Sequence, residues 1–141
     1  MRMIATLLFF LIQSVDAQQE QRSVLLPASE AAQIDCKISW QPTKVDIEAL
    51  EANLPHVANL QARGWKPGQY IDHPERYFRQ YVACVSSGKR KIFVNAFCNT
   101  PSSTGWHSRL LLTKDGGSCF WHVTYDPVTK KFSGLEINGI G

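Results

Sequence analysis

The apolar positions of this chain change their spacing near residue 76. Before that point, four apolar residues recur every three or four positions, as on one side of a helix: Ile47, Leu50, Leu54 and Val57. Thr43 and Asp46 form a short version of a capping box, which predicts the start of this helix. Pro55 is expected to kink or divide it, because proline lacks a backbone donor, and the helical pattern ends near residues 63–68.

After residue 76 the pattern favours strands joined by short turns. Strands are predicted in five segments: 76–85, 90–98, 108–113, 118–125 and 132–138. A further short strand is predicted at 36–40. One helical segment followed by strands predicts an α+β fold, in which the N-terminal helix packs on a curled antiparallel sheet of about 4–5 strands, cystatin-like by analogy.

Residues 1–17 have the order of features found in a secretory signal peptide: Arg2, an apolar run and a cleavage site ending at Ala17. Residues 18–35 are polar and lack a clear period, so we expect a flexible leader. Residues 36–141 are expected to form a single α+β domain, secreted or periplasmic. No other segment is apolar enough to predict membrane insertion after signal removal.

Charge and missing motifs exclude several functions. The net charge is only +3, and the densest basic run, GKRK at 88–91, is typical of a solvated turn, so no nucleic-acid partner is predicted. The four histidines stand apart from one another without metal-ligand spacing, and we predict neither a metal site nor a cofactor. No acid/base or nucleophile set emerges, which favours a protein that is not an enzyme.

The chain has four cysteines, at Cys36, Cys84, Cys98 and Cys119. An even number in an exported protein predicts two disulfides, with three possible pairings. Cys119 lies in DGGSCFW, which has some local similarity to the nucleophile region of papain-like proteases. His122 follows closely, but by the period of two it falls on the opposite strand face, so we interpret Cys119 as half of a disulfide.

Residues 80–84, QYVAC, are similar to the Q-x-V-x-G hairpin motif of protease-inhibiting cystatins. Cys84 stands in place of the glycine, and the turn residues come later, at 86–88. We therefore interpret Gln80 and Val82 as ordinary members of one strand face.

Residues 79–141 contain the string G-K-R-x-I-x-V-N-A-F-C, then a tryptophan, D-G-G-S-C-F, and Y-D-P-x-T-x-x-F-x-x-L-x-x-N-G. In this string the chain resembles a family of small exported bacterial proteins of unknown function. The resemblance implies export and one α+β domain, and it assigns no activity. It implies that Cys98 and Cys119 are common to the group, which leaves Cys36 and Cys84 as an additional pair. We predict Cys98–Cys119 as the main disulfide and Cys36–Cys84 as the second.

Aromatic side chains on an open sheet face are suited to binding a ligand or partner. The residues predicted for such a surface are Trp106, Phe120, His122 and Tyr81. We expect a small exported, non-catalytic binding or inhibitor module, acting on another protein such as a hydrolase or a toxin. The alternative is an exported hydrolase with no recognisable motif. The sequence does not indicate an oligomeric state.

Overall fold

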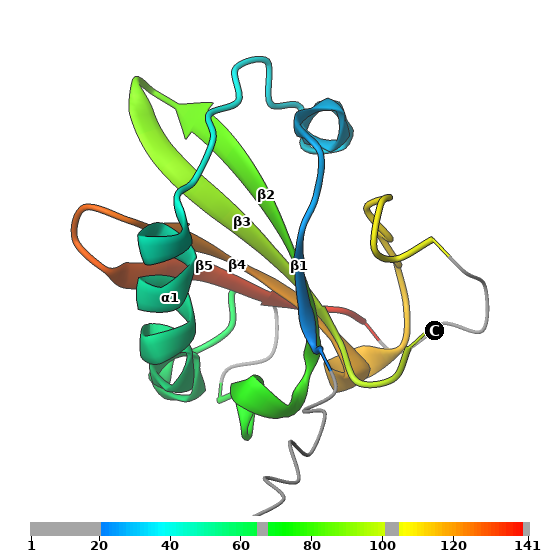
Figure 1. Cartoon of the computed structure of the whole chain (residues 1–141). Coiled ribbons are helices and arrows are strands. Elements are labelled where there is room, and N and C mark those ends of the chain that lie inside the picture. The colour runs from blue at the N-terminus through cyan, green and yellow to red at the C-terminus, as the bar shows by residue number, and fades with distance from the viewer. Residues whose placement is uncertain (1–20, 65–67, 101–104, 140–141) are drawn as a thin grey trace, which may run out of the picture.

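A five-stranded sheet forms the centre of the computed structural model, and helix α1 (Lys44–Asn53) lies across one of its faces (Figure 1). The structure describes residues 21–64, 68–100 and 105–139. The predicted signal peptide lies outside the described residues. Within these three ranges, no helix has both the length and the apolar character needed to cross a membrane.

The sheet is mixed rather than purely antiparallel. Its strands are β1 (Ser23–Leu25), β2 (Phe78–Ser86), β3 (Lys89–Phe97), β4 (Phe120–Asp126) and β5 (Lys131–Ile137). They lie in this order, and β2 to β5 are joined as antiparallel neighbours, whereas β1 runs parallel to β2. The α+β class is confirmed, and the expectation of an all-antiparallel sheet is corrected by β1.

Local sequence signals set the limits of α1. The Thr43 hydroxyl accepts a hydrogen bond from the Asp46 amide, and the Asp46 carboxylate accepts one from the Thr43 amide. This reciprocal pair satisfies two backbone donors that a helix start otherwise leaves free. Pro55 divides the helical segment as predicted, since α1 ends at Asn53 and a 3₁₀ helix, η2 (Leu54–Asn59), follows it.

The sheet face toward α1, here called the inner face, carries the main core. Leu50, Leu54 and Val57 of the helical segment have no exposed surface and pack against alternate residues of β3 and β4. On this face the register sets Val94 opposite Val123, both fully buried. Removal of this apolar surface from water is the main force that holds the helical segment on the sheet.

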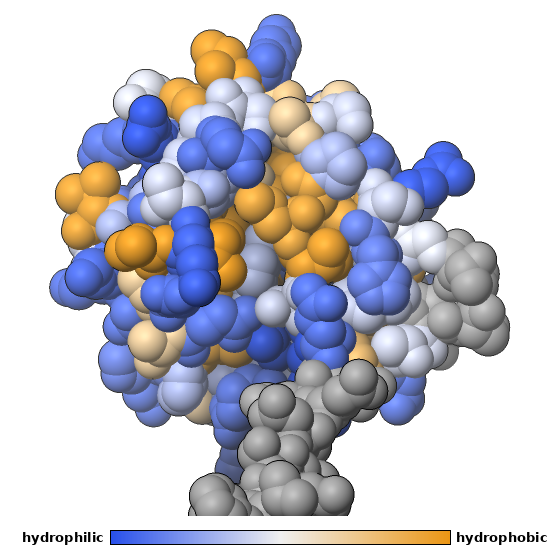
Figure 2. All heavy atoms as spheres, viewed as in Figure 1, coloured by the Kyte–Doolittle hydropathy of each residue, from blue (hydrophilic) through white to orange (hydrophobic). Residues whose placement is uncertain are grey.

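The opposite, outer face is covered by two irregular segments. A 3₁₀ helix, η1 (Ala28–Ile34), and residues 105–111 lie on the side of the sheet away from α1 (Figure 1). Leu110 is only 4 % exposed there, and the Trp106 ring packs edge-on against Phe78 with centroids 5.8 Å apart. Figure 2 shows hydrophobic side chains reaching the surface between η1 and residues 105–111, beside β1.

The described part of residues 18–35 is not the flexible leader that the sequence predicts. Residues 23–25 pair with β2, and the amide of Leu26 donates to the Tyr81 carbonyl. Ala31 of η1 is buried against the outer face. These residues lack a local pattern because their partners lie far away in the sequence. The folded domain therefore begins before residue 36.

Two predicted strands are also absent from the described chain. Residues 36–40 have irregular backbone, although the Val85 amide donates to the Ile38 carbonyl. Residues 108–113 form no ladder either, and β3 pairs directly with β4. The apolar run at 110–112 reflects packing on the outer face, where side-chain amides rather than a neighbouring strand bind the Leu111 backbone.

Candidate functional site

The sheet register arranges the outer-face residues of β3, β4 and β5 in rows. Three rows run across these strands: Lys91–Asp126–Lys131, Phe93–Thr124–Ser133 and Asn95–His122–Glu136. Within the third row, Asn95 is buried beneath residues 105–111, whereas Glu136 is exposed. The cover on the outer face therefore thins from β3 toward β5.

A groove of about 380 Å³, here called the outer-face groove, lies over this thinly covered half. Its side chains include Arg63, Lys91, Phe93, His122, Thr124, Ser133 and Glu136. Ile34, the last residue of η1, lines it as well, so the groove starts where the cover of the outer face ends. This volume is at the lower end of the range found for small-molecule sites.

His122 and Glu136 form a pair inside the groove, with Nε2 of the imidazole 3.1 Å from a carboxylate oxygen. The imidazole also lies beside the Phe93 ring, with ring centroids 5.2 Å apart. Burial lowers the pKa of His122 below its ordinary value, and the Glu136 charge opposes this only in part. Burial thus disfavours the charged imidazolium form of His122, although a carboxylate lies beside it.

Lys91, which lines the groove, forms an ion pair with Asp126 at 2.7 Å. The Asp126 carboxylate also accepts hydrogen bonds from the backbone amides of Val128 and Thr129. The hydrogen bond from Lys91 is the main cause that lowers the pKa of Asp126 to about 2. The Lys91 charge is thus matched within the protein.

Arg63 has a different environment. Its amide donates a 2.7 Å hydrogen bond to the Leu135 carbonyl, which fixes its backbone beside β5. Its side chain is exposed, and no described carboxylate forms an ion pair with it. The guanidinium lies by Gly134, where a Cβ would be 3.7 Å from Cζ of Arg63. Gly134 has a φ of 68° and lies at an irregularity of the β4–β5 pairing.

The four residues predicted as a binding surface do not form one. Tyr81 is 1 % exposed and faces α1, because β2 alternates and the inner face takes its odd-numbered residues. Trp106 is 6 % exposed and fills the outer-face cover. Phe120 is half-buried beside a separate apolar cavity that also includes Leu111. Of the four, His122 alone lines the outer-face groove.

All four cysteines are in disulfides, Cys36–Cys84 and Cys98–Cys119, with the pairing expected from the sequence. Cys98–Cys119 joins the residue after β3 to the residue before β4, and the Cys98 amide also donates to the Cys119 carbonyl. Cys119 therefore has no free thiol to act as a nucleophile. His122 has no hydrogen bond to a hydroxyl group in the part of the chain that the structure describes.

Gln80 and Val82, the residues shared with the cystatin motif, are buried. Gln80 has no exposed surface, and its amide nitrogen donates to the carbonyls of Trp106 and Arg109. This environment agrees with the interpretation of both residues as members of a strand face. Neither is placed to enter a protease cleft.

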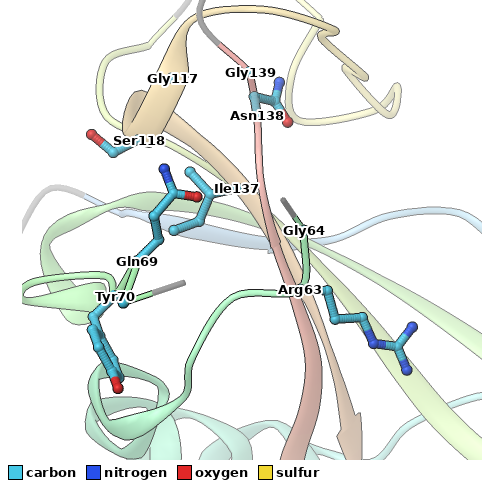
Figure 3. A pocket seen from close by; sticks show the side chains of 10 residues that line it. Arg63, Gly64, Gln69, Tyr70, Gly117, Ser118, Ile137, Asn138 and Gly139 are labelled. Atoms are coloured by element: carbon cyan, nitrogen blue, oxygen red, sulfur yellow. The ribbon is translucent and has the colours of Figure 1, made fainter. Parts of the chain in front are cut away.

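A second cavity, of about 460 Å³, lies on the other side of Arg63. Gln69, Tyr70, Ser118 and Ile137 contribute to it, and Figure 3 shows the Arg63 side chain pointing away from Gln69 and Ile137. Arg63 also belongs to this lining, and the other lining residues, several of them glycines, carry no charge. No group of three or more His, Cys, Asp or Glu residues within 21–64, 68–100 and 105–139 is arranged to hold a metal ion.

The sequence pattern does not predict Arg63, Phe93 and Glu136 as site residues. The alternation of β3 and β4 places Phe93 and His122 on the same sheet side, so this signal was present in the sequence. Nothing local marks Arg63, because its position depends on a bridge to Glu136 more than seventy residues away. No family model matches the chain, and neither a curated protein nor a solved structure matches it.

Proposed function

We propose that this chain is a small exported, non-catalytic binding module whose ligand lies in the outer-face groove. One observation carries the proposal. The same sheet face is closed by η1 and residues 105–111 over β2, yet over β4 and β5 it remains a groove with an aromatic side chain and polar groups. Such a combination is common in sites that orient small ligands.

The proposal includes a location outside the cytoplasm, secreted or periplasmic, with the mature chain starting near Gln18. Two disulfides support it, because such bonds persist mainly in oxidising compartments. Mass spectrometry of the exported protein provides the test. A product that begins at Gln18 is expected, and an intact Met1 on a cytoplasmic product would contradict export.

The analogy with cystatin-like folds is supported by one helix packed across antiparallel hairpins. An inhibitor that used Gln80 and Val82 in the cystatin manner is disfavoured, because both side chains are buried. A groove of about 380 Å³ suits a small ligand better than a hydrolase or a toxin. A protein partner is therefore an alternative that the binding experiment addresses.

The experiment is a proton–nitrogen correlation NMR titration of the mature chain with four probes that share a phenyl ring: benzyl alcohol, benzylamine, benzoate and phenyl phosphate. At least one probe is expected to shift the backbone amides of residues 91–93, 122–124 and 133–136, while those of α1 stay in place. Ligands of this size bind in the millimolar range, so each probe is taken to about 10 mM. If no probe shifts the groove amides, the groove is not a small-ligand site.

The exported hydrolase remains the second candidate, favoured only by the His122–Glu136 pair. Hydrolysis of a chromogenic ester by the wild type and by His122→Gln separates the two functions. A binding module shows no turnover that depends on His122. A rate that falls at least about a hundredfold in the variant would establish an enzyme.

A further inference from the structure

The charged side chains of the outer-face groove are not equally satisfied. Lys91 is matched by Asp126 at 2.7 Å, and Nε2 of His122 lies 3.1 Å from the Glu136 carboxylate. The Arg63 guanidinium has neither an ion pair nor a hydrogen bond with any described residue. A guanidinium presents up to five donors in a fixed plane, and a carboxylate can accept two of them at once.

The fold holds this cation at the groove rather than leaving it on a free loop. The Arg63 amide is hydrogen-bonded to the Leu135 carbonyl, and the neighbouring Ala62 amide is hydrogen-bonded to the Gln69 carbonyl. The guanidinium lies beside Gly134, whose missing side chain leaves room at the strand. Arg63 belongs to the lining of both cavities, and Figure 3 shows its guanidinium pointing away from Gln69 and Ile137 of the second one.

The rest of the groove supplies apolar contact and hydroxyl groups. Phe93 lies in the row that also contains Thr124 and Ser133, and all three line the same groove as Arg63. An aromatic ring binds the apolar part of a ligand, while the hydroxyls donate or accept hydrogen bonds. A single unmatched cation fits a monoanion better than a dianion, because the second charge of a phosphate ester would remain unpaired.

From this arrangement we infer that the outer-face groove binds a small organic carboxylate with an apolar body, whose carboxylate pairs with Arg63 and whose body packs on Phe93. The inference rests on the proposed function, because it assigns the ligand chemistry of the same groove. It goes further than that proposal, because it requires a negative charge on the ligand at the position of the Arg63 guanidinium. Glu136 lies on the same side of the sheet, so its negative charge opposes the ligand and limits its affinity.

The four phenyl probes of the NMR titration test the charge requirement. Benzoate is expected to bind at least about tenfold more tightly than benzyl alcohol, which is the ratio that a charge-assisted hydrogen bond provides. Benzylamine is expected to bind more weakly than the alcohol. Phenyl phosphate is expected to bind no more tightly than benzoate, and a clear preference for it would overturn the assignment of a carboxylate.

Variants test the role of Arg63. Arg63→Gln is expected to reduce benzoate affinity to that of benzyl alcohol. Arg63→Lys keeps the positive charge but not the planar arrangement of donors, and its benzoate affinity is expected to be intermediate. Arg109→Gln is the matched control, because Arg109 is exposed and its hydrogen bonds to described residues use only its backbone amide and carbonyl. Glu136→Gln is expected to strengthen benzoate binding several-fold, since it removes the opposing charge.

The outcomes separate the two proposals. If benzyl alcohol or benzylamine shifts the groove amides as strongly as benzoate does, the carboxylate inference is wrong while the binding function stands. If no probe binds in the groove, both are wrong. Equal losses of benzoate affinity in Arg63→Gln and Arg109→Gln would show a response to net charge only, and would also overturn the inference. Melting curves of each variant identify any loss that comes from unfolding.

Discussion

Asn95 of β3 lies opposite Gln80 of β2, and its amide nitrogen donates a 3.0 Å hydrogen bond to the Gln80 amide oxygen. The same oxygen accepts the Leu111 amide at 3.0 Å, and the Gln80 nitrogen donates to the carbonyls of Trp106 and Arg109. Asn95 donates in turn to the Leu111 carbonyl. Two side-chain amides thus take the place of a neighbouring strand and hold residues 105–111 on the outer face.

Replacement of Gln80 by alanine is expected to lower the free energy of unfolding by about 2–4 kcal/mol, because three buried or partly buried backbone groups, of Trp106, Arg109 and Leu111, lose their hydrogen bond to its side chain. Urea denaturation followed by tryptophan fluorescence measures the change. Gln61→Ala, at an exposed position after η2, serves as control and is expected to stay within about 0.5 kcal/mol. A loss for Gln80→Ala as small as that of the control would contradict this role.

Glu51 joins α1 to the sheet through a buried charge. Its carboxylate lies 2.9 Å from Arg79, whose side chain is only 6 % exposed, and it also accepts the Tyr81 hydroxyl. Glu51→Gln leaves Arg79 without its counterion, so we expect a loss of about 2–3 kcal/mol, reduced from the fully buried case because Glu51 is partly exposed. Glu48→Gln, which breaks an exposed pair with Lys44 on the same helix, is expected to cost under about 0.5 kcal/mol in the same denaturation assay.

The pKa of His122, lowered mainly by burial, predicts a loss of stability in mild acid. The unfolded chain binds a proton at the ordinary histidine pKa of about 6.5, whereas the folded chain binds it only at lower pH. Unfolding is therefore favoured as the pH falls from that value to the folded pKa, and this contribution to stability is fully present above pH of about 6.5.

Melting temperatures between neutral pH and mild acid test the prediction. His122→Gln is expected to flatten the decline relative to the wild type, while His56→Gln, at an exposed position of η2, is expected to preserve it. Parallel declines in the wild type and His122→Gln would show that another group causes the acid sensitivity.

The disulfides predict the response to alkylation. Iodoacetamide is expected to label none of the four cysteines in the native, oxidised protein and all four after reduction in denaturant. Because Cys119 has no free thiol, Cys119→Ser is not expected to remove any thiol-dependent activity. Rapid labelling of Cys119 in the untreated protein would instead show a free thiolate there.

Features with nearby partners could be predicted from the sequence. The two residues of the capping box, Thr43 and Asp46, are three positions apart, and the β2–β3 turn uses Ser87 and Gly88, both with positive φ. The strand at 108–113 was predicted wrongly because Leu110 and its neighbours are apolar for a different reason, namely packing on the outer face. The sequence of β1 contains no strand pattern, because its three residues form a strand only through their pairing with β2.

At the site, the alternation along each strand predicted which residues share a face of the sheet. It did not predict which parts of each face other segments of the chain would bury. It placed His122 correctly with respect to Trp121, and the burial of alternate residues in β4 agrees. It did not show that Tyr81 faces α1 or that Trp106 packs between Phe78 and Phe97. Those outcomes depend on the paths of segments that are distant in the sequence.

The irregular pairing at Gly134 has a consequence for how the sequence of β5 tolerates change. Phe132 is buried, Ser133 is exposed, Leu135 is buried and Glu136 is exposed, so the alternation is regular once Gly134 is skipped. Gly134 acts as a one-residue insertion in β5: it lengthens the strand, but the residues after it keep the same alternation between the two faces of the sheet. A chain lacking this one residue is expected to keep the same side chains of β5 on the core side of the sheet. The strand can therefore change in length beside Arg63 while the alternation of core-facing and solvent-facing side chains stays intact.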